Sequence, residues 1–152
     1  HTPGHAKHHL AWEWGRTVFT GDVAGVNIGN GPVVPPCPPP DINIEDWFGS
    51  IQLILDRNPE ELVLTHYGSR TNVHAHMMEL QEMLHDWAYW IKTNMESGMS
   101  ADELTPLFMH YTNTQLCLRD VSEEGLKQYE AANPAWMSVA GLMRYWGKKV
   151  RG

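Results

Sequence analysis

The feature that most restricts the fold of this chain is a proline-rich segment, GNGPVVPPCPPPD, which spans residues 29–41. Five prolines between Pro35 and Pro40 fix the φ angle and remove backbone N–H donors, so this segment cannot form a helix or an interior strand. We expect an extended, polyproline-like loop on the surface. It is either a simple connector or a wall beside a site, because it begins only a few residues after Asp22.

A β-hairpin is indicated just before this loop. The segment HLAWEW alternates apolar and polar residues, which places Leu10, Trp12 and Trp14 on one face of a strand. Gly15-Arg16 suits a turn, and the β-rich run TVFT follows it. We therefore expect two strands in a hairpin that ends at Gly21-Asp22.

A helix and a further strand are expected after the loop. Asn43 has the side chain of a helix N-cap, apolar residues then recur at helical spacing, and Asn58-Pro59 ends the pattern. The run ELVLT, residues 61–65, predicts a short strand that leads directly into His66. Asp22 and His66 thus both lie at the ends of expected strands.

The second half of the chain has the pattern of successive helices. From about Asn72 to Gly98 an apolar stripe recurs at helical spacing, formed by Val73, Met77, Leu80, Leu84, Trp87 and Ile91. Three more helix starts are indicated by the capping-box spacing of Ser100 and Glu103, by Ser122 and by Asn133-Pro134. The last helix carries the apolar residues Trp136, Val139, Leu142, Met143 and Trp146.

Composition limits the class of partner. Eleven basic and eighteen acidic residues give the 152-residue chain a formal net charge of −7, which provides no general attraction for nucleic acid or an anionic membrane. Cys37 and Cys117 form no CxxC pair, so neither a disulfide framework nor a thiolate zinc site is indicated. No apolar run reaches the roughly 18 residues of a membrane span, and no signal-peptide pattern is seen. We expect a cytoplasmic protein with no nucleic-acid or membrane partner.

Three residues are candidate metal ligands: His5 in TPGHAKHHL, Asp22 in FTGD and His66 in LTHYG. Each follows a turn-forming element or an expected strand, as happens where several loops converge on one metal site. Neutral imidazole and carboxylate groups suit zinc, iron or manganese. Any one of these motifs alone is more often an ordinary turn, so the ordered set of three indicates the site.

In this order the three motifs resemble the second half of the metallo-β-lactamase superfamily, especially its hydroxyacylglutathione hydrolase (glyoxalase II)-like branch. The resemblance covers roughly residues 2–87, including PPPDINIEDW and the helix after it. It implies that His5 binds one metal, that His66 binds a second, and that Asp22 bridges both as the catalytic carboxylate. His9 resembles the other histidine of the family's TPGHxxGH pattern and is interpreted as a supporting or packing residue.

The resemblance also implies a fold. It is α/β (α+β): half of a four-layer αββα metallo-β-lactamase sandwich over residues 1–93, followed by a C-terminal helical extension over residues 94–152. Such a half exposes a sheet face and at least one strand edge. The extension covers a substrate entrance by analogy, and its basic residues are either contacts for an acidic substrate or solubilising charges; these are Lys127, Arg144, Lys148 and Lys149.

One family motif is absent. The His-x-His-x-Asp-His segment, which supplies most of the remaining metal ligands, does not occur in these 152 residues. His74 and His76 give only the His-x-His part, on an expected helix where residues two apart point in different directions, so we interpret them as ordinary helical residues. The missing N-terminal half of the domain is expected in another chain or as a removed segment. A second copy of this chain, in a homodimer, is the remaining possibility.

The resulting prediction is a binuclear metal-dependent hydrolase that cleaves a small-molecule thioester or related ester by a metal-bound hydroxide. Its cofactors are two divalent metal ions, namely zinc, with iron or manganese as alternatives. Tyr67 either orients a substrate carbonyl or fills the loop. The alternative is a noncatalytic interaction or dimerisation module that retains remnants of a metal site.

Overall fold

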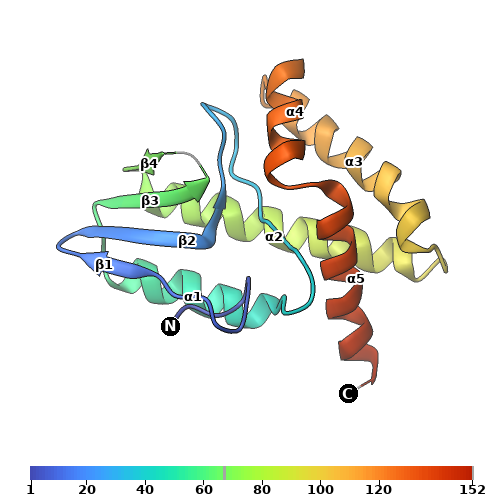
Figure 1. The fold of residues 1–152 in the computed structure, drawn as a ribbon, viewed down its shortest axis with the longest axis horizontal. Helices are drawn as coiled ribbons and strands as arrows, with labels where there is room; N and C mark the ends of the chain where they lie inside the picture. Colours follow the sequence, from blue (N-terminus) through green and yellow to red (C-terminus); the bar gives the residue numbers. More distant parts are fainter. Residues whose placement is uncertain (67, 152) are drawn as a thin grey trace.

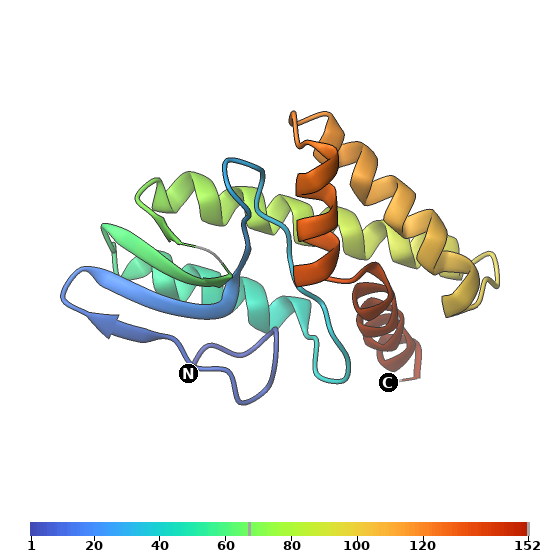
Figure 2. The ribbon, with the colours of Figure 1, turned by 45° about the horizontal axis from the view of Figure 1, so that its top comes forward.

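The computed structural model describes residues 1–66 and 68–151, which form one four-stranded mixed sheet and five helices (Figure 1). In chain order the elements are β1 (Trp12–Trp14), β2 (Thr17–Val26), α1 (Ile44–Asp56), β3 (Glu61–His66), β4 (Ser69–Arg70), α2 (Val73–Met95), α3 (Ala101–Cys117), α4 (Glu123–Ala132) and α5 (Ala135–Arg151). Helices α1 and α2 run alongside the sheet, whereas α3, α4 and α5 gather beyond the carboxyl ends of β2 and β3 (Figures 1 and 2). The fold is therefore α/β, with its helical part at one end of the sheet.

The expected hairpin is confirmed, but its second strand is longer than the sequence indicates. β1 pairs antiparallel with β2, with Trp12 opposite Phe19 and Trp14 opposite Thr17. The prediction that the hairpin ends at Gly21-Asp22 is wrong, because β2 continues to Val26. Gly21 has a φ of +56°, and the register of β2 against β3 shifts on both sides of it. This irregularity lets the strand bend where the local pattern suggested an end.

The two faces of the sheet differ sharply in burial. On one face Val18 and Leu62 lie side by side in the parallel β2–β3 pair, and both are buried beneath the helices. The other face, called the open face here, carries Trp12, Trp14 and Phe19, which are 70%, 80% and 44% exposed. The expectation of an exposed sheet face therefore holds for the part of the chain that the structure describes.

Three of the predicted helix starts are confirmed by their capping contacts. The side chain of Asn43 accepts a hydrogen bond from the backbone N–H of Asp46 at the start of α1. Ser100 and Glu103 form the complete capping box of α3, and Ser122 caps α4. Within the described ranges, none of the helices has the length and apolar character needed to cross a bilayer.

The core lies between the sheet and the helices α1, α2, α3 and α5. All six residues of the predicted α2 stripe are buried. Of the apolar residues that α5 carries, Val139 and Leu142 are fully buried, but Trp136 is 57% exposed. The preceding residue, Ala135, is buried, so Trp136 points away from the core at the first turn of the helix.

The proline-rich loop is held against the C-terminal helices. The hydroxyl of Tyr129 donates to the carbonyl of Pro32 (2.6 Å), and the amide of Asn133 donates to that of Pro35 (3.1 Å). Helix α5 approaches the loop so closely that a Cβ atom on Gly141 would lie 1.9 Å from the carbonyl oxygen of Cys37. Glycine is therefore required at position 141 for the loop and α5 to pack.

Two glycines of α5 provide a matched test of this packing. Gly141→Ala is expected to lower the free energy of unfolding by about 2 kcal/mol, because the added methyl meets rigid backbone. Gly147→Ala has open space and is expected to raise it by up to about 1 kcal/mol through better helix propensity. Urea unfolding of both variants checks this, and equal effects would refute the close packing of loop and helix.

Candidate metal centre

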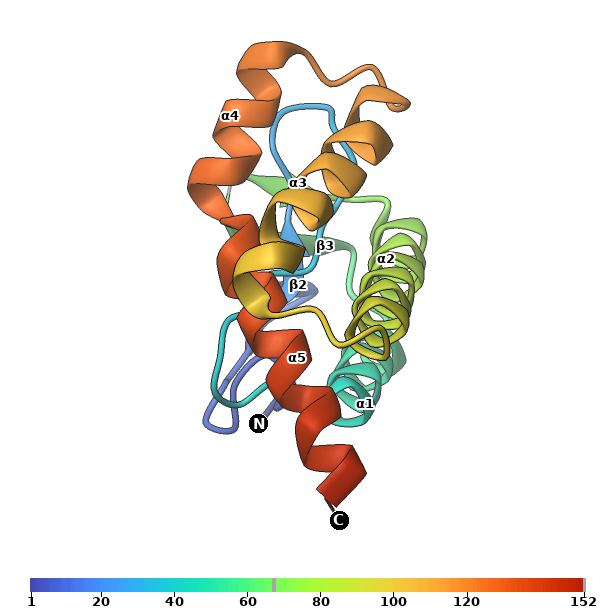
Figure 3. The ribbon, with the colours of Figure 1, turned by 90° about the vertical axis from the view of Figure 1, so that its right-hand side faces the viewer.

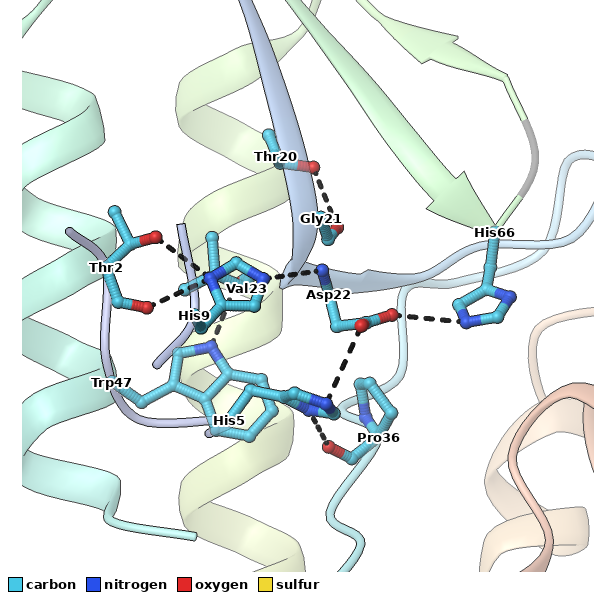
Figure 4. Close-up of polar contacts among 10 residues, drawn as sticks. All are labelled: Thr2, His5, His9, Thr20, Gly21, Asp22, Val23, Pro36, Trp47 and His66. Atoms are coloured by element: carbon cyan, nitrogen blue, oxygen red, sulfur yellow. Dashed lines mark hydrogen bonds and ion pairs between the residues drawn. The ribbon is translucent and has the colours of Figure 1, made fainter. Parts of the chain in front are cut away.

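The three candidate ligands come together where the irregular part of β2 meets the carboxyl end of β3 (Figure 4). His5 lies in the loop before β1, Asp22 lies in the irregular part of β2, and His66 is the last residue of β3. The expected position of Asp22 at the end of a strand is wrong, because β2 continues to Val26. The parallel pairing of β2 with β3 brings Asp22 near His66.

The two imidazoles face different oxygens of one carboxylate. Nε2 of His5 lies 3.6 Å from Oδ2 of Asp22, and Nε2 of His66 lies 3.1 Å from Oδ1. Ligand atoms bound to one tetrahedral ion at 2.0–2.2 Å are separated from each other by about 3.4 Å. Both contacts are therefore close to the spacing of paired ligands, one pair on each side of Asp22.

His5 is held in one orientation by its surroundings. Its Nδ1 lies 2.9 Å from the carbonyl oxygen of Pro36, and a carbonyl can only accept, so Nδ1 carries the proton. The edge of the ring packs on Trp47, with ring centroids 5.6 Å apart. With Nδ1 protonated, Nε2 of His5 faces the Asp22 carboxylate, and a lone pair there would be stable beside that carboxylate only with a proton or cation between them. The proline-rich loop thus contacts the site through Pro36. This favours the interpretation of the loop as a wall beside the site over that of a simple connector.

His9 supports Asp22 through the backbone. The N–H of Asp22 donates to Nε2 of His9 (3.0 Å), so Nδ1 carries the proton and donates to the carbonyl of Thr2 (3.0 Å). Burial lowers the pKa of His9, and the nearby His5 lowers it further, which keeps the ring neutral. Since Nε2 is already used, His9 is a supporting residue. A Cβ on Gly21 would lie 2.4 Å from this Nε2, so glycine is needed beside it.

The three side chains do not form a complete metal site by themselves. Among the described residues, no group of three or more His, Cys, Asp and Glu side chains is arranged to hold a metal ion. His5 and His66 each face a different oxygen of Asp22. A tetrahedral zinc ion between Asp22 and either imidazole would receive two donors from these residues and would need further donors.

His74 and His76 lie outside this centre. His76 is 3% exposed, and its Nε2–H donates to the carbonyl of Ala24 (2.8 Å), which ties α2 to β2. His74 is exposed on the neighbouring turn. The two side chains thus point in different directions, as predicted. The burial of His76 and its contact with β2 were not predicted from the sequence.

A polar cavity of about 570 Å³ lies beyond the end of β2, and the sequence analysis missed it. None of His5, Asp22 and His66 is among its lining residues. Its lining residue Asn27 follows β2, with its backbone N–H directed at the carbonyl of His66 (3.5 Å). Oδ1 of Asn27 is buried without a hydrogen-bond partner among the described residues. Arg70 and Arg119 reach the cavity from β4 and from the turn after α3. Polar side chains in loops carry no periodic pattern that could have revealed this cavity.

Tyr67, for which the sequence suggested a role beside a substrate, lies outside the described residues.

Comparison with known proteins gives similarity to solved structures only. No family model and no curated protein matches the chain. Among solved structures, the chain is similar to a metallo-beta-lactamase superfamily protein of the archaeon Sulfolobus tokodaii, with 31% sequence identity and a TM-score of 0.48. The match covers 55% of this chain and 31% of that chain. The chain thus spans less than a third of that protein's length, and no branch of the superfamily is assigned.

The buried His76 of α2 predicts a pH effect on stability. Burial lowers the pKa of His76, with Arg70 adding to the shift and Glu79 opposing it. The folded state therefore binds fewer protons than the unfolded state, so this contribution to stability is complete above about pH 6.5 and is lost as the pH falls towards the folded pKa. Stability should fall between pH 7.5 and 5.5.

Urea unfolding at these two pH values checks the effect. His76→Gln, which cannot titrate, is expected to reduce the difference in unfolding free energy between the two pH values. His74→Gln, on the exposed side of the same helix, should leave it unchanged. An undiminished pH dependence in His76→Gln would contradict the assignment.

Proposed function

We propose that this chain provides half of the binuclear metal centre of a hydrolase of the metallo-β-lactamase type. The observation that carries the proposal is that His5 and His66 present Nε2 atoms to opposite oxygens of Asp22, while Pro36 fixes the tautomer of His5. A carboxylate that faces one imidazole on each side is suited to bridging two cations. The ordered motifs TPGH, FTGD and LTHYG support the same family.

Each residue of the centre has a separate task in this proposal. His5 and His66 hold one ion each, and Asp22 holds both and keeps them close together. Two bound divalent cations, zinc or alternatively iron or manganese, would supply Lewis acidity that activates water and stabilises developing negative charge. His9 fixes the backbone of Asp22, and the Trp47 ring beneath His5 keeps water from one side of the centre.

The remaining donors come, in this proposal, from outside these 152 residues. Two protein donors per ion are too few for a closed zinc site, and the described residues near Asp22 supply no others. The open face offers an apolar surface on which a companion half of the domain would pack, since Trp12 and Trp14 are far more exposed than tryptophans usually are. The centre and the sheet would be completed by one partner.

The substrate class we propose is a small ester, with a thioester as the leading candidate. The 570 Å³ cavity beyond the end of β2 is large enough for a small molecule, and the backbone of its lining residue Asn27 contacts the carbonyl of His66. Its lining includes guanidinium groups of Arg70 and Arg119 and carboxylates of Glu79 and Asp120, so both signs of charge are present. The buried Oδ1 of Asn27 accepts a hydrogen bond from a substrate N–H or O–H group.

The second candidate function is a noncatalytic interaction or dimerisation module. The exposed aromatic side chains of the open face favour it, because such a patch is characteristic of protein contacts. In this case the His5–Asp22–His66 group is a remnant that holds no ion. Metal binding therefore separates the two functions.

A zinc titration tests the proposed centre. In competition with a chromophoric chelator, the chain is expected to bind two ions. Asp22→Asn should weaken both sites by more than about tenfold, because one carboxylate serves both, whereas His66→Ala should weaken only one. With the companion half present, chelation or Asp22→Asn should abolish hydrolysis of an acyl thioester.

The control is His8→Ala, which removes an exposed histidine from the same segment and should not alter binding. The proposal fails if Asp22→Asn binds zinc as the unaltered chain does. It also fails if His66→Ala removes both ions, because the sites would then not be divided by the carboxylate.

The open face generates a separate prediction about assembly. In isolation the chain should self-associate through this face, since its exposed tryptophans form an apolar patch that is stabilised by burial. The double variant Trp12→Ser, Trp14→Ser should shift the sedimentation equilibrium towards monomer by at least about tenfold in the dissociation constant. Leu118→Ser is the control, because Leu118 is equally exposed but lies after α3. Equal sedimentation of both variants would exclude the open face as the contact.

A further inference from the structure

A second cavity, of about 340 Å³, lies where α1, α2 and α5 meet. Figure 3 shows these three helices converging near the C-terminal end of α5. The cavity has no lining residue in common with the His5–Asp22–His66 group. Its lining consists of Ile44, Glu45, Phe48, His85, Ala88, Tyr89, Lys92, Tyr145, Trp146 and Lys149. Nothing in the proposed hydrolase function uses it.

The aromatic walls of this cavity are fixed in place. The indole N–H of Trp146 donates to the carbonyl of Ala88 (2.8 Å), which locks the ring against α2. The hydroxyl of Tyr145 donates to the carboxylate of Glu45 (3.0 Å). The rings of Tyr145 and Trp146 pack edge to face, with centroids 4.8 Å apart. Rigid aromatic walls bind a flat ligand without having to be ordered first.

The charges of the cavity favour an anionic ligand. Lys149 pairs with Glu45, so these two groups neutralise each other. Lys92 is different: its ammonium lies 5.1 Å from the centre of the Trp146 ring, and it takes part in none of the ion pairs among the described residues. A cationic ligand is disfavoured, because the chain's own ammonium groups already lie over the rings of Trp146 and Tyr145.

We propose that this cavity binds a small planar aromatic carboxylate. The ring of the ligand lies against Phe48, Tyr89 and Trp146, and its carboxylate pairs with the ammonium of Lys92. The volume is at the small end of the range for ligand sites, which suits one or two fused rings and excludes a nucleotide. His85, exposed at the rim, adds a hydrogen-bonding group beside the carboxylate.

The experiment uses 2-naphthoate and its uncharged analogue 2-naphthalenemethanol as probes. Binding is measured by titration calorimetry and by the NMR shift of the Trp146 indole N–H. The full chain is expected to bind the carboxylate roughly tenfold more tightly than the alcohol, as one charge-assisted hydrogen bond would give. Lys92→Met should reduce the affinity for 2-naphthoate to that of the alcohol.

Two further variants complete the test. Tyr89→Ser removes an aromatic wall at a residue that is 63% exposed, so the fold should persist while both probes bind several-fold more weakly. Lys127→Met, on α4 and outside the cavity, is the charge control and should bind as the unaltered chain does. Equal affinity for the two probes, no loss in Lys92→Met, or an equal loss in Lys127→Met would each overturn the proposal.

Discussion

The arrangement of the candidate centre depends on the hydrogen bond from the backbone N–H of Asp22 to Nε2 of His9. This bond holds the irregular part of β2 against the N-terminal loop, and Thr2 in turn fixes the His9 ring. Because the loop is held, His5 reaches one side of the carboxylate, while the parallel strand β3 delivers His66 to the other. The His9–Asp22 contact thus joins the segment of His5 to the strand of Asp22, and the β2–β3 pairing adds His66.

Much of the fold could be predicted, because it follows from local chemistry. The caps at Asn43, Ser100 and Ser122 and the apolar stripe of α2 are features that a helix needs within its own sequence. The continuation of β2 beyond Gly21 could not be predicted, since it depends on pairing with β3, forty residues away. The two-residue strand β4 has too little sequence for any periodicity.

The candidate site also has a part that could be predicted from the sequence and a part that could not. His5, Asp22 and His66 were found because each belongs to a short motif, and the structure brings them together, whereas their role as ligands remains a prediction. The Pro36 carbonyl that orients His5 carries no sequence signal, because every residue has a carbonyl. Asn27, Arg70 and Arg119 come from three different elements and meet only through the tertiary fold.

If the chain functions as proposed, the open face and the incomplete donor set have a common physical explanation. A carboxylate with an imidazole on each side would provide two donors per ion, and the sheet beside it buries only one of its faces. Apolar burial of the open face would contribute binding energy, and the same contact would bring further donors to the ions. Metal binding and association would then stabilise each other, since each supplies what the other lacks. The weaker the ions bind to this chain alone, the larger the share of their affinity that must come from the partner.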